Sequence, residues 1–269
     1  MNRKVLFITG ATDGIGRLTA ADLAKQHRGS TILIHGRNNE KLEKSTIEIK
    51  KESGNPNIEP WLADFSSLIE VRTMANGILA KHPSINILIN NAGAGFSAPR
   101  YGQDGIEMRL AVNYLAPMLL TRLLLPALKK NPDSRIINVA SAGQSVIHFD
   151  DIMLENKFDG VTAYTQSKLA LIMFTMDLAE ELRPDHISVN CLHPGTYLDT
   201  GMVREAGISP QGSAQSGADA IVYLATSPDL KNVTGKYFNV QKESRAHAQA
   251  YDADARKKLR ILASKLTGI

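Results

Sequence analysis

The stretch Val5-Leu-Phe-Ile-Thr-Gly10-Ala-Thr-Asp-Gly14-Ile-Gly16 joins a short apolar run to a glycine-rich turn, and a helical pattern follows over 17–27. A strand, a glycine turn and a helix in this order predict the first half of a βαβ unit. Glycines allow a sharp turn and let backbone amides approach a pyrophosphate at the helix N-terminus. The alternative is a simple turn without a ligand. The residues placed to contact such a ligand are Gly10, Thr12, Asp13, Gly14, Ile15 and Gly16.

The alternation of strand-like and helix-like segments continues along the chain. Amphipathic stretches such as 39–52 and 68–81 separate short apolar runs, which predict strands at 5–9, 31–35, 58–62, 85–90, 135–140, 187–192 and 236–240. We therefore expect an α/β fold, a single Rossmann-type doubly wound parallel sheet of about seven strands with helices on both faces. Residues 1–269 form one domain in this interpretation, and 244–269 form a C-terminal helical extension that caps a sheet edge or makes a subunit contact.

Composition narrows the function classes. The chain has 269 residues, 43% of them hydrophobic, enough for one large α/β core. The net charge of +4 is mild, and the lysine pairs at 50–51, 129–130 and 257–258 are isolated, so we expect no nucleic-acid partner. The single cysteine, Cys191, excludes an intrachain disulfide and a cysteine-based zinc site, and its apolar surroundings predict a buried thiol.

The N-terminus leads directly into the first strand and lacks a signal-peptide layout. The most apolar segment, 110–128, is interrupted by Asn113, Pro117 and Arg122, so we expect no membrane span. A cytoplasmic protein is the resulting expectation.

The end of the second strand reads His35-Gly36-Arg37-Asn38. A dinucleotide site that selects NAD usually places a carboxylate about 20 residues past the glycines, on the ribose 2′-hydroxyl. Here no acid is present and Arg37, followed by Asn38, is placed to meet a 2′-phosphate. This favours NADP(H) over NAD(H), although Arg37 could also be an ordinary surface residue.

After the third strand, Asp64 and Phe65 are placed near an adenine ring, where Asp64 could accept a hydrogen bond from the amino group. Asp64 could equally cap the next helix, or Ser66 or Ser67 could do so.

Tyr164 and Lys168 lie four positions apart in a helical segment and therefore share one helix face. An ammonium one turn from a phenol favours the phenolate and moves the hydroxyl toward useful acid/base strength. Taken alone, the pair is more typical of a solvated helix face.

Further residues give the pair a context. Asn91-Ala92-Gly93 follows the fourth strand, Asn113 lies in the next helix, Ser141 closes the fifth strand, and Pro194-Gly195 follows the sixth. With these residues, the chain from 3 to about 240 resembles the short-chain dehydrogenase/reductase family of the single-domain type. The stretch between Ser141 and Tyr164, and the sequence His193-Pro194-Gly195, resemble the retinol dehydrogenase-like branch, which commonly uses NADP.

The resemblance implies roles for a catalytic set of Asn113, Ser141, Tyr164 and Lys168. Tyr164 would be the general acid in carbonyl reduction and the base in alcohol oxidation, and Ser141 would donate a hydrogen bond to the substrate oxygen. Lys168 would hold the nicotinamide ribose and lower the tyrosine pKa. Asn113 would disturb its helix enough to hold a water linking Lys168 to solvent. Cofactor contacts are implied for Tyr164, Lys168, Asn91, Ala92, Gly93, Pro194, Gly195, Thr196 and Thr200.

One departure concerns the loop after Gly195. Many family members place a threonine five residues after the proline, against the nicotinamide carboxamide, but here that position is Asp199. Either the loop holds an extra residue and Thr200 makes the contact, or Thr196 does.

Two segments are expected to enclose the substrate: a mobile lid over 197–216 and a wall over 146–160. Met202, Val203, Ile147 and Phe149 suggest an apolar pocket, or simply packing. His148, Asp150 and Asp151 favour turn chemistry over a metal site, and we expect no metal.

We therefore expect an NADP(H)-dependent oxidoreductase acting on a carbonyl or alcohol of a small to medium apolar molecule. The resemblance also implies a homodimer or homotetramer paired through the helices that carry Asn113 and Tyr164. The alternative is an NADP(H)-binding regulatory protein with little turnover, although such a protein would often lose Tyr164 or Lys168. A nucleotide-sugar epimerase shares that pair but usually has a different glycine spacing and a larger C-terminal domain.

Overall fold

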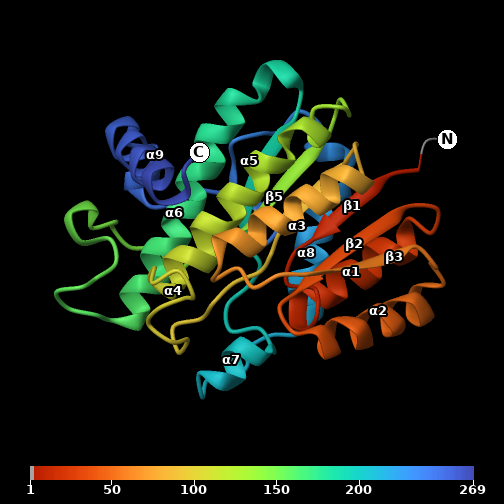
Figure 1. Ribbon diagram of the computed structural model, residues 1–269, viewed down its shortest axis with the longest axis horizontal. Helices are drawn as coiled ribbons and strands as arrows, with labels where there is room; N and C mark the ends of the chain where they lie inside the picture. The colour runs from red at the N-terminus through yellow and green to blue at the C-terminus, as the bar shows by residue number, and fades with distance from the viewer. Residues whose placement is uncertain (1–2) are drawn as a thin grey trace.

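The computed structural model describes residues 3–269 and contains one eight-stranded sheet in the order β3-β2-β1-β4-β5-β6-β7-β8 (Figure 1). Neighbouring strands from β3 to β7 are parallel, and β8 pairs with β7 in the antiparallel sense. The strands are β1 (Val5–Ile8), β2 (Thr31–Gly36), β3 (Ile58–Leu62), β4 (Ile87–Asn90), β5 (Arg135–Val139), β6 (Ser188–His193), β7 (Tyr237–Asn239) and β8 (Lys242–Ser244).

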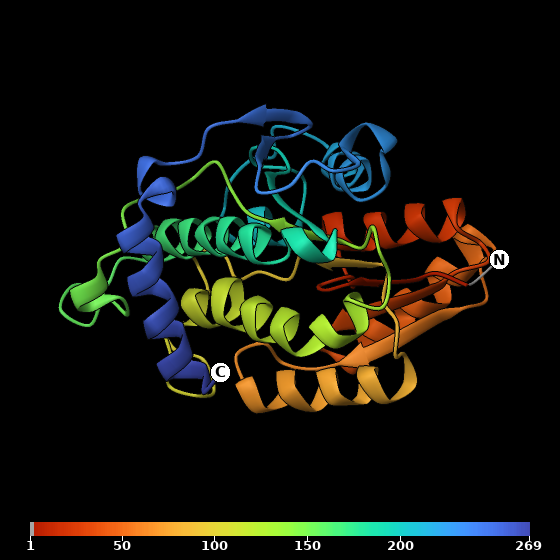
Figure 2. The same ribbon diagram turned by 90° about the horizontal axis from the view of Figure 1, so that it is seen from above.

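Helices cover both faces of the sheet, as expected (Figure 2). One face carries α1 (Gly14–Gln26), α2 (Asn39–Ser53) and α8 (Ala214–Thr226). The other carries α3 (Leu68–Lys81), α4 (Met108–Leu110), the π-helical turn η1 (Ala111–Leu115), α5 (Ala116–Leu128) and α6 (Gly160–Glu181). Outside these layers lie α7 (Gly201–Glu205), α9 (Ala253–Thr267) and the 3₁₀ turns η2 (Phe149–Asp151), η3 (Arg183–Asp185), η4 (Pro228–Leu230) and η5 (Ala248–Tyr251).

Helix boundaries follow local chemistry. The Asn38 side chain accepts a hydrogen bond from the Lys41 amide at 2.9 Å and begins α2, and Gly54 ends it with a left-handed φ of +67°. Asp13 begins α1 by accepting a hydrogen bond from the Gly14 amide at 2.7 Å. These are the ordinary N-cap and C-cap devices of α-helices.

The C-terminal extension differs from the expectation at its start. Residues 242–244 form β8 and extend the sheet by one antiparallel strand, where we expected seven strands followed by helices. A strand of three polar residues, Lys242-Glu243-Ser244, lacks the apolar pattern by which strands are recognised.

The rest of the extension is helical. Helix α9 lies across α6, where Arg256 pairs with Asp177 at 3.2 Å and with Glu180 at 3.2 Å (Figure 2). The apolar side of α9 is buried through Ala255, Leu259 and Ala263. The expected cap is therefore found over helices, not over a sheet edge.

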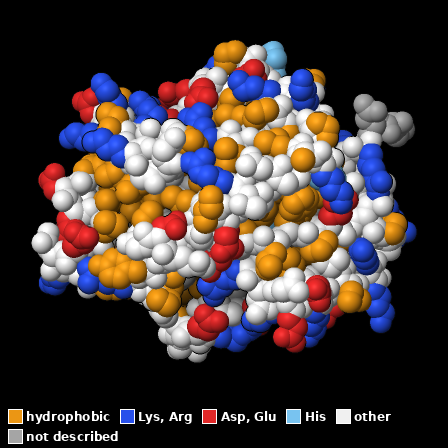
Figure 3. Space-filling model, in the orientation of Figure 1, with side chains coloured by type: hydrophobic (Ala, Val, Ile, Leu, Met, Phe, Trp, Pro, Cys, Tyr) orange, Lys and Arg blue, Asp and Glu red, His pale blue; other side chains and the backbone are white. Residues whose placement is uncertain are grey.

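The segment Met108–Leu128 is long and apolar enough to cross a membrane, by length and composition alone. Most of it, 78%, is buried inside the protein, which is also typical of a core helix, so it is weak evidence for a membrane. On the face drawn in Figure 3, acidic and basic side chains are interspersed.

Cys191 is fully buried, and burial raises the pKa of its thiol to about 12.

Candidate active site

The glycine turn packs against the turn that follows β4. A Cβ added to Gly10 would lie 2.7 Å from the Ala92 Cα, and one added to Gly16 would lie 2.2 Å from the Gly10 carbonyl oxygen. Gly10 and Gly14 also have φ values of +64° and +52°. These positions therefore require glycine. The turn opens α1, whose first-turn amides lack carbonyl partners within the helix, so the backbone here fits a pyrophosphate.

The β4 turn is tied to β1 by Thr9 and Asn91. The Thr9 hydroxyl accepts hydrogen bonds from the amides of Asn91 and Ala92 at 2.9 and 3.0 Å, and the Asn91 side chain donates to the Thr9 carbonyl at 2.9 Å. Strands β1 and β4 are neighbours at the point where the strand order reverses. In doubly wound sheets this is where ligands bind.

His35, which the sequence analysis left without a role, fixes the glycine turn from the end of β2. Its Nδ1 accepts a hydrogen bond from the Gly10 amide at 3.1 Å, its Nε2 lies 2.9 Å from the Ala63 carbonyl oxygen, and its ring stacks on Phe65 at 4.1 Å. Burial lowers its pKa to about 4, so the imidazole is neutral and Nε2 carries the proton. The parallel register of β1 and β2, which brings Gly10 beside His35, is the signal that could have identified it.

Arg37 is exposed at the end of β2, and no ion pair of its side chain is found within residues 3–269. The positive charge of Arg37 is close enough to Asp64 to affect the pKa of that carboxyl. Burial alone would raise the Asp64 pKa, but hydrogen bonds from Ser66 and Gln103 and the charge of Arg37 lower it overall.

The local role of Asp64 is clear. Its carboxylate accepts hydrogen bonds from the Ser66 amide at 2.9 Å and the Gln103 side chain at 3.0 Å, so it organises its own turn.

Neither serine caps α3, contrary to the expectation. The Ser67 side chain makes no cap hydrogen bond, and the Leu68 amide donates to Asp104 at 2.6 Å instead. Asp104 lies 36 positions away, beyond any local pattern.

The structure gathers the four expected catalytic side chains at the carboxyl ends of β4 and β5. Ser141 follows β5, and Tyr164 and Lys168 lie on α6. The Lys168 ammonium donates to the Val139 carbonyl at 2.9 Å and lies 5.8 Å from the centre of the Tyr164 ring. A Cβ added to Gly93 would lie 3.3 Å from Asn113 Oδ1 and 3.6 Å from Lys168 Nζ. These contacts argue against the solvated helix face.

Asn113 lies in the π-helical turn η1, so the expected disturbance of its helix is present. Its Oδ1 accepts from the Ala94 amide at 2.7 Å, and its Nδ2 donates to the Ala94 carbonyl at 3.1 Å and the Ser167 hydroxyl at 2.9 Å. Single π-helical turns often occur at functional sites. Here the turn joins the loop after β4 to α6.

Burial dominates the electrostatics of the site. It lowers the pKa of Lys168 to about 8, and it raises that of Tyr164, an effect that hydrogen bonding with Ser141 opposes. The net pKa of Tyr164 is therefore raised, and its lowering by Lys168 stays a prediction. The ammonium interacts with the Val139 carbonyl and with the ring, and burial of the phenol is the larger effect.

The segment after β6 folds over the glycine turn. Gly195, after Pro194, has a φ of +137°. A Cβ added to Gly14 would lie 3.1 Å from the Thr200 methyl group, and one added to Gly95 would lie 2.7 Å from Met202. Thr196 lies 3.1 Å from His193 Nε2. Thr200 is thus at the glycine turn, whereas Thr196 bonds within its own loop.

The proposed apolar wall is partly core. Ile147 is 2% exposed, and Phe149 packs against the main hydrophobic cluster, so both serve packing. Asp151 accepts hydrogen bonds from the amides of Glu155 and Asn156, at 2.7 and 3.1 Å, and shapes a turn. Within residues 3–269 no group of three metal-ligating side chains occurs.

Comparisons with known proteins agree with this geometry. The family model "short chain dehydrogenase" matches residues 4–210. The chain belongs to the short-chain dehydrogenase family. It is 35% identical to retinol dehydrogenase 13 of Mus musculus, over 99% of this chain and 84% of that protein.

Two solved structures resemble this short-chain dehydrogenase with TM-scores of 0.70. The Pseudomonas aeruginosa RhlG/NADP complex is 26% identical and covers 88% of this chain and 94% of its own. The Brucella melitensis 3-ketoacyl-(acyl-carrier-protein) reductase, complexed with NADH, is 26% identical and covers 88% of this chain and 96% of its own. The two complexes hold different nicotinamide cofactors, NADP in the first and NADH in the second.

Sequence reasoning missed a buried ion pair in this short-chain dehydrogenase. Arg109 pairs with Glu107 at 2.8 Å, and both side chains are at most 1% exposed. The guanidinium also donates to the carbonyls of Gly95 at 3.2 Å and Phe96 at 2.9 Å. The Phe96 ring meets Tyr164 edge-on, with centroids 6.1 Å apart. Arg109 thereby fixes the loop that brings an apolar ring to Tyr164.

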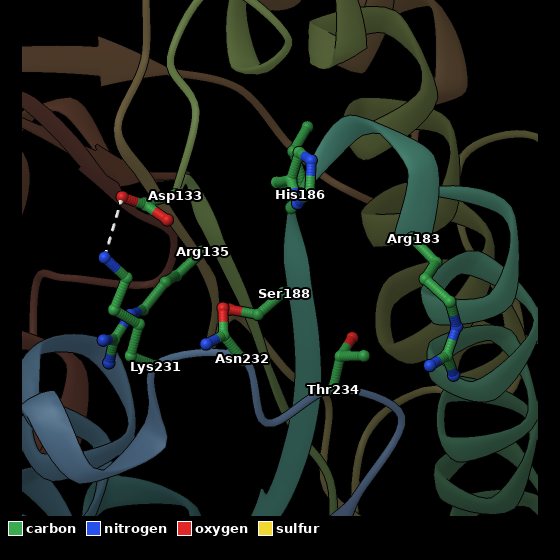
Figure 4. Close-up of a pocket in the computed structure, with 9 residues that line it drawn as sticks. Asp133, Arg135, Arg183, His186, Ser188, Lys231, Asn232 and Thr234 are labelled. Carbon is green, nitrogen blue, oxygen red and sulfur yellow. Dashed lines mark ion pairs between the residues drawn. The ribbon is translucent and has the colours of Figure 1, made fainter.

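A separate cavity of about 210 Å³ lies at the opposite end of the strands, where β5 and β6 begin (Figure 4). Arg135 and Lys231 lie on one side of Ser188 and Arg183 on the other. Arg135 and Ser188 begin β5 and β6, whereas the expected catalytic side chains lie at the carboxyl ends of the strands, so this cavity is not part of the candidate site.

Proposed function

We propose that the protein is an NADP(H)-dependent oxidoreductase that interconverts a carbonyl and an alcohol, with Tyr164 as the general acid/base. The observation that carries the proposal is the convergence of Ser141, Tyr164 and Lys168. A lysine that is 4% exposed and a tyrosine meet at the carboxyl ends of β4 and β5, next to the switch point between β1 and β4. Ionisable groups with burial-shifted pKa values in such a place favour a catalytic role.

The proton chemistry follows from the environment of each group. In reduction, the Tyr164 hydroxyl gives its proton to the carbonyl oxygen, and the Ser141 hydroxyl donates a hydrogen bond to the same oxygen as negative charge develops. Lys168, with a pKa of about 8, holds positive charge close to the phenol and stabilises the phenolate that forms. In oxidation the proton returns to Tyr164. NADP(H), when bound, supplies or accepts the hydride.

Preference for NADP(H) over NAD(H) rests on Arg37. Its exposed guanidinium follows β2, close enough to Asp64 to lower the pKa of that carboxyl. A guanidinium matches phosphate geometry and stays charged throughout the accessible pH range. The two solved relatives name both cofactors, so Arg37 is the ground for the preference.

The substrate class rests on Phe96, Met202 and the similarity to retinol dehydrogenase 13. Phe96 is edge-on to Tyr164, and Met202 approaches Gly93 and Gly95. The name of that relative denotes an apolar alcohol. We propose a small to medium apolar alcohol, aldehyde or ketone, including retinoid-like molecules.

Assembly and location are proposed on the resemblance. A homodimer or homotetramer paired through α5 and α6 would have to include α9, because α9 lies across α6. We keep cytoplasmic localisation as a prediction.

Turnover tests the proposal. Purified protein with NADPH and a panel of aldehydes, ketones and quinones should consume NADPH, followed by its absorbance. Tight NADPH binding without turnover on any of them would favour the regulatory alternative.

A further inference from the structure

The C-terminal segment lies along the loop that follows the catalytic serine. We define the strap as residues 246–249 and the serine loop as residues 141–148. Two glutamines join them. The His247 amide donates to Gln144 Oε1 at 2.7 Å, and the Ile147 amide donates to Gln249 Oε1 at 2.8 Å. The strap therefore contacts the serine loop at its start and near its end.

The first contact continues to Ser141 itself. Gln144 Nε2 donates to the Ser141 carbonyl at 2.9 Å, and the Tyr237 hydroxyl donates to the same oxygen at 3.2 Å. Tyr237 is 4% exposed, and its pKa is raised to about 12, chiefly by burial, so its hydroxyl stays a donor. The Gln144 amide thus takes a bond from the strap on one side and gives one to the serine backbone on the other.

The second contact is two-pronged. Gln249 accepts from the Ile147 amide and also donates to the Ile147 carbonyl at 3.5 Å. On the other side of Ile147, the His148 amide donates to Gln166 of α6 at 3.4 Å. The serine loop is therefore clamped between the strap and the helix that carries Tyr164.

We propose that Gln144 and Gln249 are positioning residues that let the C-terminal strap set the geometry of Ser141. The inference rests on the proposed role of Ser141 as hydrogen-bond donor to the substrate oxygen. The Ser141 Oγ accepts from the Gly143 amide at 3.0 Å, which leaves the hydroxyl hydrogen to point elsewhere, so the backbone position sets its direction. Small displacements of a catalytic group can cost up to about 100-fold in rate.

Amide-to-carboxylate variants separate positioning from general stability. Gln249→Glu keeps the acceptor for the Ile147 amide and loses only the long 3.5 Å bond to the Ile147 carbonyl, whereas Gln249→Ala loses both. Gln144→Glu keeps the acceptor for the His247 amide but loses the donor to Ser141. A matched control is Gln241→Ala, at an exposed position between β7 and β8.

Two readouts are measured on every variant: kcat and KM for the best carbonyl substrate, and hydrogen exchange of the serine loop. We expect Gln249→Ala to lower kcat/KM about tenfold, the equivalent of one hydrogen bond, and to speed exchange in 141–148, while Gln249→Glu stays close to wild type. Gln144→Ala and Gln144→Glu should both lower kcat, with KM for NADPH unchanged.

The outcomes are distinguishable. Unchanged kcat in both Gln144 variants, or equal losses in Gln249→Ala and Gln249→Glu, would overturn the positioning role. A wild-type protein without turnover that shows the expected exchange pattern would reject the proposed function and still support the strap.

Discussion

Buried cationic and aromatic groups set the chemistry at the residue scale. The buried Lys168 ammonium has one carbonyl partner, Val139, and lies 5.8 Å from the centre of the Tyr164 ring. Its lowered pKa, about 8, shows that burial outweighs these contacts. A buried lysine whose pKa is close to neutral interacts strongly with the charge of a nearby phenolate. An exposed lysine would interact with that charge only weakly, because water reduces the interaction.

Arg37 gives the first prediction at this scale. Arg37→Ala should weaken NADPH binding about 10- to 100-fold, because a charged hydrogen bond to a phosphate is lost, and should change NADH binding little. Fluorescence titration with both cofactors measures this. Arg28→Ala, an exposed arginine before β2, is the control. Equal weakening of NADPH and NADH would remove Arg37 from the 2′-phosphate.

His35 gives a pH prediction. Its folded pKa, about 4, is below the ordinary 6.5, so the folded state favours the neutral ring. The stabilisation that the neutral ring gives to the folded state is fully present above pH 6.5. It is lost as the pH falls toward 4, which lowers the free energy of unfolding by about 3 kcal/mol. Urea unfolding of wild type and His35→Gln across this range tests it. Parallel pH dependence in the two proteins would contradict the role of His35.

At the scale of elements, the loop after β4 depends on the buried Arg109–Glu107 pair. Arg109→Leu leaves Glu107 as an uncompensated buried charge and should lower the free energy of unfolding by about 3–5 kcal/mol. Arg122→Leu is the matched control. It breaks an ion pair with Glu181 whose side chains are 27% and 45% exposed, and it should cost less than about 1 kcal/mol. Similar losses in both variants would show that burial of the pair is not decisive.

The helix α9 sets a prediction at the scale of the whole molecule. Asp177 is 9% exposed and pairs with both Arg256 and Arg260 of α9. Asp177→Asn should cost about 1–3 kcal/mol and speed hydrogen exchange in α9. Asp185→Asn, which loses a more exposed pair with Lys129, is the control. Exchange in α9 as slow as in wild type would mean that apolar packing alone holds the helix.

The fold could be predicted from the sequence because the strands are apolar and bounded by turn residues. The alternation of strand and helix patterns also indicated a βαβ series. It also indicated the set of Ser141, Tyr164 and Lys168, since Ser141 closes a strand pattern and the other two share one face of a helical pattern. It did not reach His35 or Asp104, whose partners lie 25 to 36 positions away, or Arg109, which bonds mainly to backbone carbonyls besides its near neighbour Glu107. Strand β8 was missed because three polar residues carry no periodicity.

In the proposed function, Tyr164 transfers the proton in an NADPH-dependent reduction. Stopped-flow measurement of NADPH oxidation by Tyr164→Phe, with the best substrate of the panel, tests this proton transfer. We predict a loss of at least about 100-fold in kcat, the usual contribution of a general acid, with NADPH affinity close to that of wild type. Turnover at the wild-type rate, with the cofactor bound equally well, would contradict the assignment.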